Sequence, residues 1–298
     1  MLGCEILGGR DWGKIDEHLA SNAVLRALDY GVNTFDTADV YGLGRSEQEL
    51  SRILGVRRHD VVIITKCGVR WAENPAGERA KTWYDSSPEY VVRSIENSLR
   101  RLRIECIPLY LVHWPDPNTP IDMTLDALVR CQEAGKIRYF GLSNFPGVKV
   151  MEANRICKLG AIEILYNLVN RECETDVLPI AQALGLGVLA YGALAQGLLT
   201  GKYTRTSVFD QTDRRHRLWH FSPEAWPVNQ RLLKRLSRVA ASYGKTLAQI
   251  AIRWVLDQPG VTAAIVGAKS PEQVDANVGA LHWSLSEDER QFLANDHI

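Results

Sequence analysis

Short apolar runs that end on a polar residue recur along this chain. The clearest are residues 32–35 ending on Asp36, 61–65 ending on Lys66 and 107–112 ending on His113. Their length and their β-branched content are typical of buried strands. Similar runs predict further strands over residues 2–7, 137–142, 161–166, 186–190 and 263–266. Together these patterns predict eight strands.

Apolar residues at helical spacing fill the intervals between these runs. Helices are predicted over about 17–30, 46–55, 88–102, 122–134, 147–158, 175–184, 229–243, 246–258, 271–281 and 286–295. The segment Ser46-Glu47-Gln48-Glu49 has the pattern of a capping box, with Ser46 as the predicted cap. Long loops are expected over residues 67–86 and from the strand at 186–190 to about residue 228.

Alternating strands and helices, with no polar linker, predict one α/β domain over residues 1–298. Eight strands favour a (β/α)8 TIM barrel with two additional helices. An open doubly wound sheet is the alternative, but it requires Gly-x-Gly-x-x-Gly after its first strand, which Gly8-Gly9 does not supply. In such a barrel the active site lies at the C-terminal ends of the strands, where the polar residues collect.

Composition narrows the possible partners. The chain has 35 Lys and Arg against 35 Asp and Glu, so its charge does not indicate a nucleic-acid or membrane partner. The six cysteines are scattered without Cys-x-x-Cys pairs, so we expect no metal site, and dispersed thiols are typical of a reducing cytoplasm. No apolar run approaches the length of a transmembrane helix, and no signal peptide is visible at the N-terminus. We therefore expect a cytoplasmic protein.

Four polar side chains at the predicted strand ends can perform acid catalysis together. Tyr41 follows Asp36 closely, and parallel strands would bring both to one rim with Lys66 and His113. A lysine ammonium favours the phenolate, and a carboxylate such as Asp36 would keep that lysine charged. His113 could polarise a substrate oxygen. This arrangement suits the protonation of a carbonyl oxygen while a cofactor hydride attacks its carbon.

The chain resembles the aldo-keto reductases over nearly its whole length. The matching segments are Asp36 with Tyr41, Thr65-Lys66, His113-Trp114-Pro115-Asp116, Gly141-Leu142-Ser143-Asn144-Phe145, Tyr166-Asn167-Leu168, Gly197-Leu198-Leu199-Thr200-Gly201-Lys202 and Gly267-Ala268-Lys269-Ser270-Pro271-Glu272-Gln273. The resemblance implies reduction of an aldehyde or ketone, with hydride from NADPH, less readily from NADH, and the proton from Tyr41. The implied partner is a small-molecule carbonyl substrate, and we expect a monomer or a weak homo-oligomer.

The resemblance also implies a set of cofactor-binding residues. Residues that match these positions hold the carboxamide (Ser143, Asn144, Glu163), stack on the ring (Tyr191), wrap the pyrophosphate (Leu194, Gln196, Leu198, Lys202) or surround the adenosine end (Gly267, Lys269, Gln273, Asn277). The predicted helix N-terminus at Ser270 is also an anion site in its own right. Arg214, in the run Arg214-Arg215-His216-Arg217, is a further candidate for phosphate.

The chain departs from the family pattern in several places, and two of these departures concern the cofactor. Glu163 stands where relatives usually have glutamine, and Gln273 stands where many have arginine, which weakens the expected preference for NADPH. An ionised Glu163 would favour the oxidised, positively charged nicotinamide, whereas a protonated Glu163 would behave as glutamine.

The substrate pocket and the role of the protein leave alternatives open. Trp12, Trp71 and Trp114 either line an apolar substrate pocket or merely cover the mouth of the barrel. The substrate could be a keto sugar, perhaps nucleotide-linked, of a biosynthetic pathway. The protein could also be a cofactor-sensing regulatory subunit that resembles potassium-channel β subunits, but those carry asparagine where this chain has His113.

Overall fold

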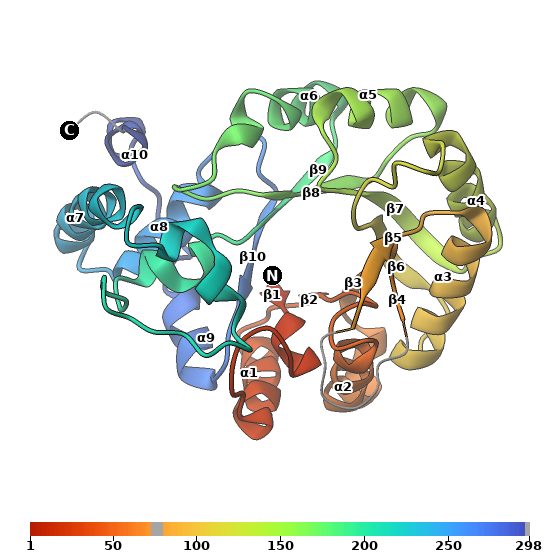
Figure 1. The fold of residues 1–298 in the computed structure, drawn as a ribbon, viewed down its shortest axis with the longest axis horizontal. Coiled ribbons are helices and arrows are strands. Elements are labelled where there is room, and N and C mark those ends of the chain that lie inside the picture. Colours follow the sequence, from red (N-terminus) through yellow and green to blue (C-terminus); the bar gives the residue numbers. More distant parts are fainter. Residues whose placement is uncertain (73–79, 296–298) are drawn as a thin grey trace.

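Eight parallel strands close into a barrel in the computed structural model, which describes residues 1–72 and 80–295 (Figure 1). The strands follow the order β1-β10-β9-β8-β7-β6-β3-β2 around the barrel. They are β1 (Leu2–Gly3), β2 (Thr34–Asp36), β3 (Val62–Cys67), β6 (Ile107–Val112), β7 (Ile137–Ser143), β8 (Ala161–Leu165), β9 (Gly187–Tyr191) and β10 (Ala263–Gly267). The predicted (β/α)8 barrel is confirmed, and each strand lies within a few residues of its predicted range.

Helices surround the barrel, and two of them lie outside the ring. The α-helices are α1 (Glu17–Asp29), α2 (Arg45–Leu54), α3 (Pro88–Leu102), α4 (Ile121–Glu133), α5 (Gly147–Ile156), α6 (Val177–Leu184), α7 (Trp226–Tyr243), α8 (Leu247–Leu256), α9 (Pro271–Val278) and α10 (Glu287–Ala294). Short 3-10 helices are η1 (Glu5–Gly8), η2 (Gly55–His59), η3 (Glu172–Glu174), η4 (Ala195–Thr200), η5 (Arg214–Arg217) and η6 (Trp219–Phe221). The two additional helices, α7 and α10, pack against each other beside the ring (Figure 1).

The barrel interior explains why polar side chains converge at one end. Five buried residues from five strands form its apolar layer: Ile64, Leu111, Ala161, Leu189 and Ile265. Side chains alternate along a strand, so the residue two positions further on points into the barrel again. That next layer contains Lys66, His113, Glu163, Tyr191 and Gly267. The apolar core therefore supports a polar layer at the C-terminal end of the barrel.

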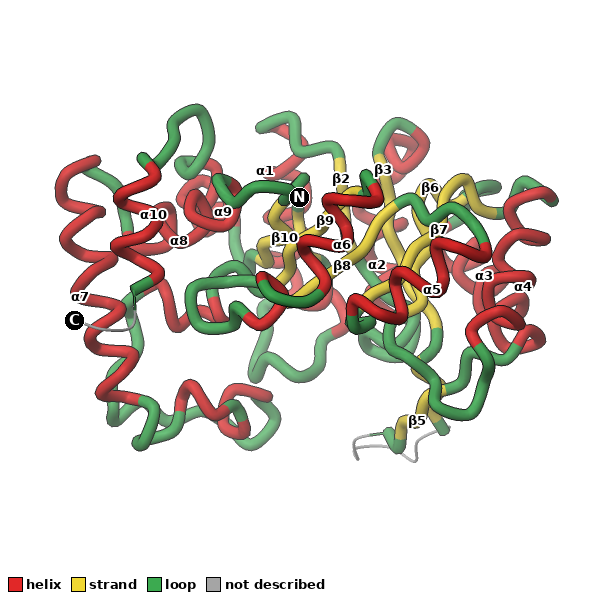
Figure 2. The backbone as a smooth tube through the Cα atoms, turned by 90° about the horizontal axis from the view of Figure 1, so that it is seen from above, coloured by secondary structure: helices red, strands yellow, loops and turns green. Residues whose placement is uncertain are grey.

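The segment 67–86 was wrongly predicted to be an irregular loop. It contains a two-stranded antiparallel sheet of β4 (Val69–Trp71) and β5 (Thr82–Tyr84), with Arg70 paired to Trp83. Arg70 also lies over the Trp83 ring at 5.5 Å from its centroid. In Figure 2, β5 lies at the lower edge of the molecule, beyond the strands of the barrel.

The predicted capping box at Ser46 is wrong. Helix α2 begins at Arg45, after Gly44, whose φ of 95° is left-handed, and no side chain caps this end. The Ser46 hydroxyl donates instead to the Cys4 carbonyl at 2.7 Å and bonds the Thr37 hydroxyl at 2.7 Å. Both partners adjoin barrel strands, so Ser46 ties the helix to the barrel.

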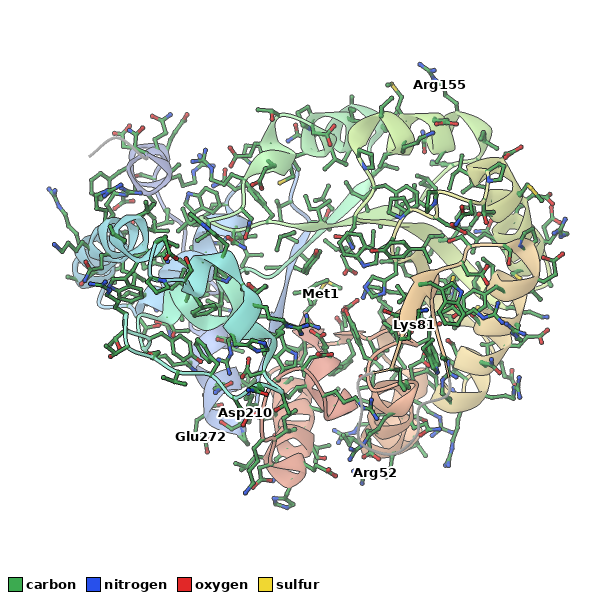
Figure 3. The ribbon with its side chains drawn as sticks, viewed as in Figure 1. Met1, Arg52, Lys81, Arg155, Asp210 and Glu272 are labelled. Atoms are coloured by element: carbon green, nitrogen blue, oxygen red, sulfur yellow. The ribbon has the colours of Figure 1, made fainter. Side chains whose placement is uncertain are left out.

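The chain begins inside the ring. Met1 lies near its centre (Figure 3), where its ammonium group donates to the Ala264 carbonyl of β10 at 3.2 Å. No helix within residues 1–72 and 80–295 is both long and apolar enough to cross a membrane.

Candidate active site

Lys66 is a fully buried ammonium held by two carboxylates. Its Nζ lies 2.5 Å from Asp36 Oδ2 and 3.2 Å from Glu163 Oε2, and it donates to the Thr37 carbonyl at 3.0 Å. Burial alone would lower the pKa of Lys66, but the two carboxylates outweigh burial and raise it. Lys66 therefore remains an ammonium at neutral pH.

Tyr41 and His113 face each other above this group. Their ring centroids are 5.8 Å apart with the planes nearly perpendicular, and Lys66 Nζ lies 5.5 Å from the Tyr41 centroid. Tyr41 sits in the turn after β2, and Gly42 fixes that turn because its Cα packs against Gly8 with a left-handed φ of 61°. The four side chains predicted to converge are thus neighbours.

Both aromatic groups are electrically neutral in this environment. Burial, assisted by the positive charges of Lys66 and Arg214, lowers the pKa of His113 well below its usual value. Burial also raises the pKa of Tyr41 well above its usual value, and the negative charges of Glu5 and Asp36 add to this effect. The positive charge of Arg214 opposes this increase in the pKa of Tyr41, whereas the sequence analysis expects Lys66 to do so. Tyr41 is a phenol with a proton to give, and His113 is a neutral imidazole.

A cavity of about 960 Å³ opens above these residues. Most of the residues predicted for the site line it: Asp36, Tyr41, His113, Asn144, Glu163, Tyr191, Leu194, Gln196, Lys202, Arg214, Gly267, Lys269, Gln273, Asn277, Trp12 and Trp114. Lys66 and Ser143 lie beneath its wall and support Asp36 and Asn144. The cavity therefore joins the strand ends to the start of α9.

Two residues predicted for the site, Trp71 and Leu198, are not among the described residues that line this cavity. Trp71 belongs to β4 and pairs with Thr82 of β5. It therefore lies in this small sheet and does not line the substrate pocket as predicted. Leu198 is almost fully buried in the apolar core, because η4 turns its side chain toward the barrel scaffold. Trp83 and Tyr84 of β5, which the sequence did not indicate, line the cavity in place of Trp71.

Asn144 and Tyr191 are fixed to each other in the cavity wall. The Tyr191 hydroxyl donates to Asn144 Oδ1 at 2.7 Å, and Asn144 Nδ2 donates to the His113 carbonyl and to the Ser143 hydroxyl, both at 3.0 Å. Asn144 has a left-handed φ of 61°, which asparagine tolerates better than most residues. The ends of β7 and β9, which flank β8, thus present an amide and a phenol ring in a defined geometry.

Three cations gather at the other end of the cavity. Burial, together with the charges of Arg215 and Lys202, lowers the pKa of Lys269. Its Nζ donates to the Trp12 carbonyl at 2.8 Å, and its backbone N–H donates to Gln273 Oε1 at 2.8 Å. Arg215 is paired with Asp213, so three positive groups face one negative group. This end of the cavity is suited to a phosphate.

Arg214 does not belong to this cationic end. Its Nη2 lies 2.5 Å from Glu5 Oε1 and 3.8 Å from Asp11 Oδ2, and its charge acts on Tyr41 and His113. The neighbouring Arg215 faces Lys269 instead. Glu5 was not predicted as a site residue. It lies just after the end of β1, much as Asp36 lies at the end of β2, so the same reasoning from strand ends could have found it.

Comparisons with known proteins identify the family of this chain. The family model described as "Aldo/keto reductase family" matches residues 2–294. The chain is 35% identical to Aldo-keto reductase YhdN of Bacillus subtilis over 97% of this chain and 87% of that protein. It is 33% identical to the NADH-specific methylglyoxal reductase of Escherichia coli, with coverages of 94% and 88%.

Solved structures show the same likeness. The glycerol dehydrogenase AKR11B4 from Gluconobacter oxydans superposes with a TM-score of 0.90 at 37% identity, covering 98% of this chain and 89% of that one. The holo form of the aldo-keto reductase AKR11C1 from Bacillus halodurans gives a TM-score of 0.79 at 28% identity, with the same coverages. The chain therefore belongs to the aldo-keto reductase family of oxidoreductases, which use nicotinamide cofactors.

Proposed function

We propose that this protein reduces a small aldehyde or ketone to an alcohol with NADPH, and that Tyr41 provides the proton. The observation that carries the proposal is the pairing of a protonated Tyr41 with a neutral His113 at the base of the cavity. A carbonyl oxygen placed between the two rings could accept a hydrogen bond from each. Both hydrogen bonds would become stronger as negative charge develops on that oxygen.

The proton is supplied by this chain's own residues. Tyr41 would give its O–H proton to the oxygen. The positive charge of Arg214, with the Lys66 ammonium 5.5 Å from the Tyr41 ring centroid, would stabilise the phenolate that forms. Asp36 keeps Lys66 charged and in place at 2.5 Å. Neutral His113 contributes a hydrogen bond that orients the substrate oxygen.

The cavity fits a nicotinamide dinucleotide, which supplies a hydride when bound. Asn144 and Glu163 would hold the carboxamide, and Tyr191 would lie against the ring. Lys202, Lys269, Gln273 and Asn277 would hold the phosphates and the adenosine at the cationic end. The residues that fit the cofactor thus span the whole cavity, from strand ends to α9.

The preference for NADPH rests on the excess positive charge at that end. A 2′-phosphate beside Lys202, Arg215 and Lys269 would meet three cations against the single carboxylate of Asp213. The relatives' names do not decide the question, since one is called NADH-specific and another, from Schizosaccharomyces pombe, carries NADP(+) in its name. The charge of this chain's own cavity supports NADPH.

A hydroxylated substrate, such as a keto sugar, is the second candidate. Glu5, Asp11 and Arg214 line the catalytic end of the cavity and are suited to hydrogen bonds with hydroxyl groups. The similarity to a glycerol dehydrogenase and to a methylglyoxal reductase supports short, uncharged and oxygenated substrates.

A substrate panel tests this proposal. The purified protein is mixed with NADPH or NADH and a set of short aldehydes, hydroxyketones and ketoses, and cofactor oxidation is followed by absorbance while the alcohol is identified. We expect turnover of at least one short oxygenated carbonyl, with NADPH as the better donor. Tight NADPH binding without turnover of any carbonyl would instead support a cofactor-sensing regulatory subunit.

A further inference from the structure

Two carboxylates share one ammonium at the base of the cavity. Asp36 from β2 and Glu163 from β8 approach the same Lys66 Nζ, at 2.5 Å and 3.2 Å. All three side chains are at least 95% buried. With all three ionised, Asp36, Glu163 and Lys66 would together carry a net charge of −1.

Glu163 lies where a nicotinamide ring must be. The ring has to reach a carbonyl carbon that is one bond from the oxygen held by Tyr41 and His113. Glu163 and Tyr191 line the cavity beside these two residues, on the adjacent strands β8 and β9. This step rests on the proposed function, because it takes a cofactor hydride as the reductant.

The surroundings of Glu163 favour its neutral form, even though the Lys66 ammonium is close to it. Burial, followed by the negative charge of Asp36, raises the pKa of Glu163 well above its usual value, and Lys66 opposes this shift. Within the described part of the chain, the phenols of Tyr41 and Tyr191 also interact with Glu163, and both are neutral. Its register partner on β7 is the uncharged Ser143, and that on β9 is Leu189.

We propose that Glu163 couples the oxidation state of the bound nicotinamide to a proton. Beside the uncharged reduced ring its carboxyl keeps the proton. Beside the positively charged oxidised ring its O–H bond breaks, the proton goes to solvent through the cavity, and the carboxylate pairs with the ring. Two unit charges about 5 Å apart, at an effective dielectric near 20, change such an ionisation equilibrium roughly a hundredfold. Glutamine at this position could not respond in this way.

Proton release on cofactor binding tests the inference. Binding of NADP⁺ and of NADPH is measured by titration calorimetry between pH 6 and 9, each in two buffers of different ionisation enthalpy. The difference between the number of protons released with NADP⁺ and the number released with NADPH reports on the charge of the nicotinamide ring. Protons released by the phosphates cancel in this difference, because both cofactors carry the same phosphates. We expect a difference that approaches one proton in wild type and vanishes in Glu163→Gln. Correspondingly, the ratio of NADP⁺ to NADPH dissociation constants should fall by up to tenfold per pH unit in wild type and stay flat in Glu163→Gln.

A Tyr41→Phe variant identifies the group that releases the proton. The difference should persist in Tyr41→Phe, since the phenol keeps its proton in both complexes. Equal proton release with the two cofactors in wild type throughout this pH range would overturn the inference without any variant. A difference that survives in Glu163→Gln, or disappears in Tyr41→Phe, would also overturn it. If neither cofactor bound, the proposed function itself would fail, and that outcome is distinct from binding of both without a proton difference.

Discussion

Replacing Lys66 by methionine should expose the energetic cost of burying Asp36 and Glu163. The substitution keeps most of the side-chain volume but removes the ammonium that lies 2.5 Å and 3.2 Å from the two carboxylates. Removing one partner of a buried ion pair typically destabilises a protein by about 3–5 kcal/mol. For a chain of this size we therefore expect the melting temperature to fall by about 6–20 °C at pH 8.

The loss of stability should depend on pH with a definite sign. Without Lys66, nothing opposes the effect of burial and of Asp36, which raise the pKa of Glu163, so this carboxyl binds a proton on folding. A group with a raised folded pKa loses stability as pH rises. The deficit of Lys66→Met relative to wild type should therefore be larger at pH 8 than at pH 5.

Urea unfolding at both pH values measures this effect. Lys234→Met is the matched control, because Lys234 is exposed on α7. Adding Asp36→Asn and Glu163→Gln to Lys66→Met should recover most of the stability, since these three positions then carry no buried charge. The reasoning would be refuted by a Lys66→Met variant within about 1 kcal/mol of wild type at pH 8, or by a deficit that does not change with pH.

Three further predictions concern the cofactor, the backbone and pH. Lys269→Ala should weaken NADPH binding about ten- to a hundredfold relative to NADH, and an unchanged ratio in fluorescence titrations would contradict the phosphate assignment. Gly42→Ala should destabilise the fold, because its new Cβ would lie 2.2 Å from the Gly8 carbonyl oxygen at a left-handed φ, and a melting temperature equal to wild type would show that the turn adapts. The lowered pKa of His113 means that the unfolded chain binds a proton that the folded chain does not, so folding stability should decline by up to about 1.4 kcal/mol per unit as pH falls below about 6.5. Chemical denaturation of His113→Gln should show a shallower decline, whereas exposed His18→Gln should match wild type.

The barrel and the acid–base cluster follow from local sequence patterns. Asp36, Lys66 and His113 each end a short apolar run, and parallel strands that close into a barrel bring such ends together. Glu163 and Tyr191 obey the same alternation, since each lies two residues beyond a buried barrel residue on its strand. The ends of the apolar runs thus predicted the polar layer, and the alternation of side chains along each strand explains it.

Side-chain directions outside the strands could not be read in this way. Arg214 and Arg215 are adjacent in sequence, yet one pairs with Glu5 near Tyr41 and the other faces Lys269. In a short 3-10 helix such as η5, neighbouring side chains point in different directions. The sequence does not show which direction each side chain takes. Ser46 failed as a cap for a related reason, because its hydroxyl is engaged by Cys4 and Thr37, which are distant in sequence.

The central claim is that Tyr41 is the proton donor for carbonyl reduction. Single-turnover reduction of an accepted carbonyl, with enzyme preloaded with NADPH at pH 7, compares wild type with Tyr41→Phe, and Tyr139→Phe on the exposed side of β7 serves as the matched control. We expect Tyr41→Phe to bind NADPH normally and to transfer hydride about 10²- to 10⁴-fold more slowly, while the control keeps the wild-type rate. A Tyr41→Phe rate above about a tenth of wild type would contradict the assignment of Tyr41 as the acid.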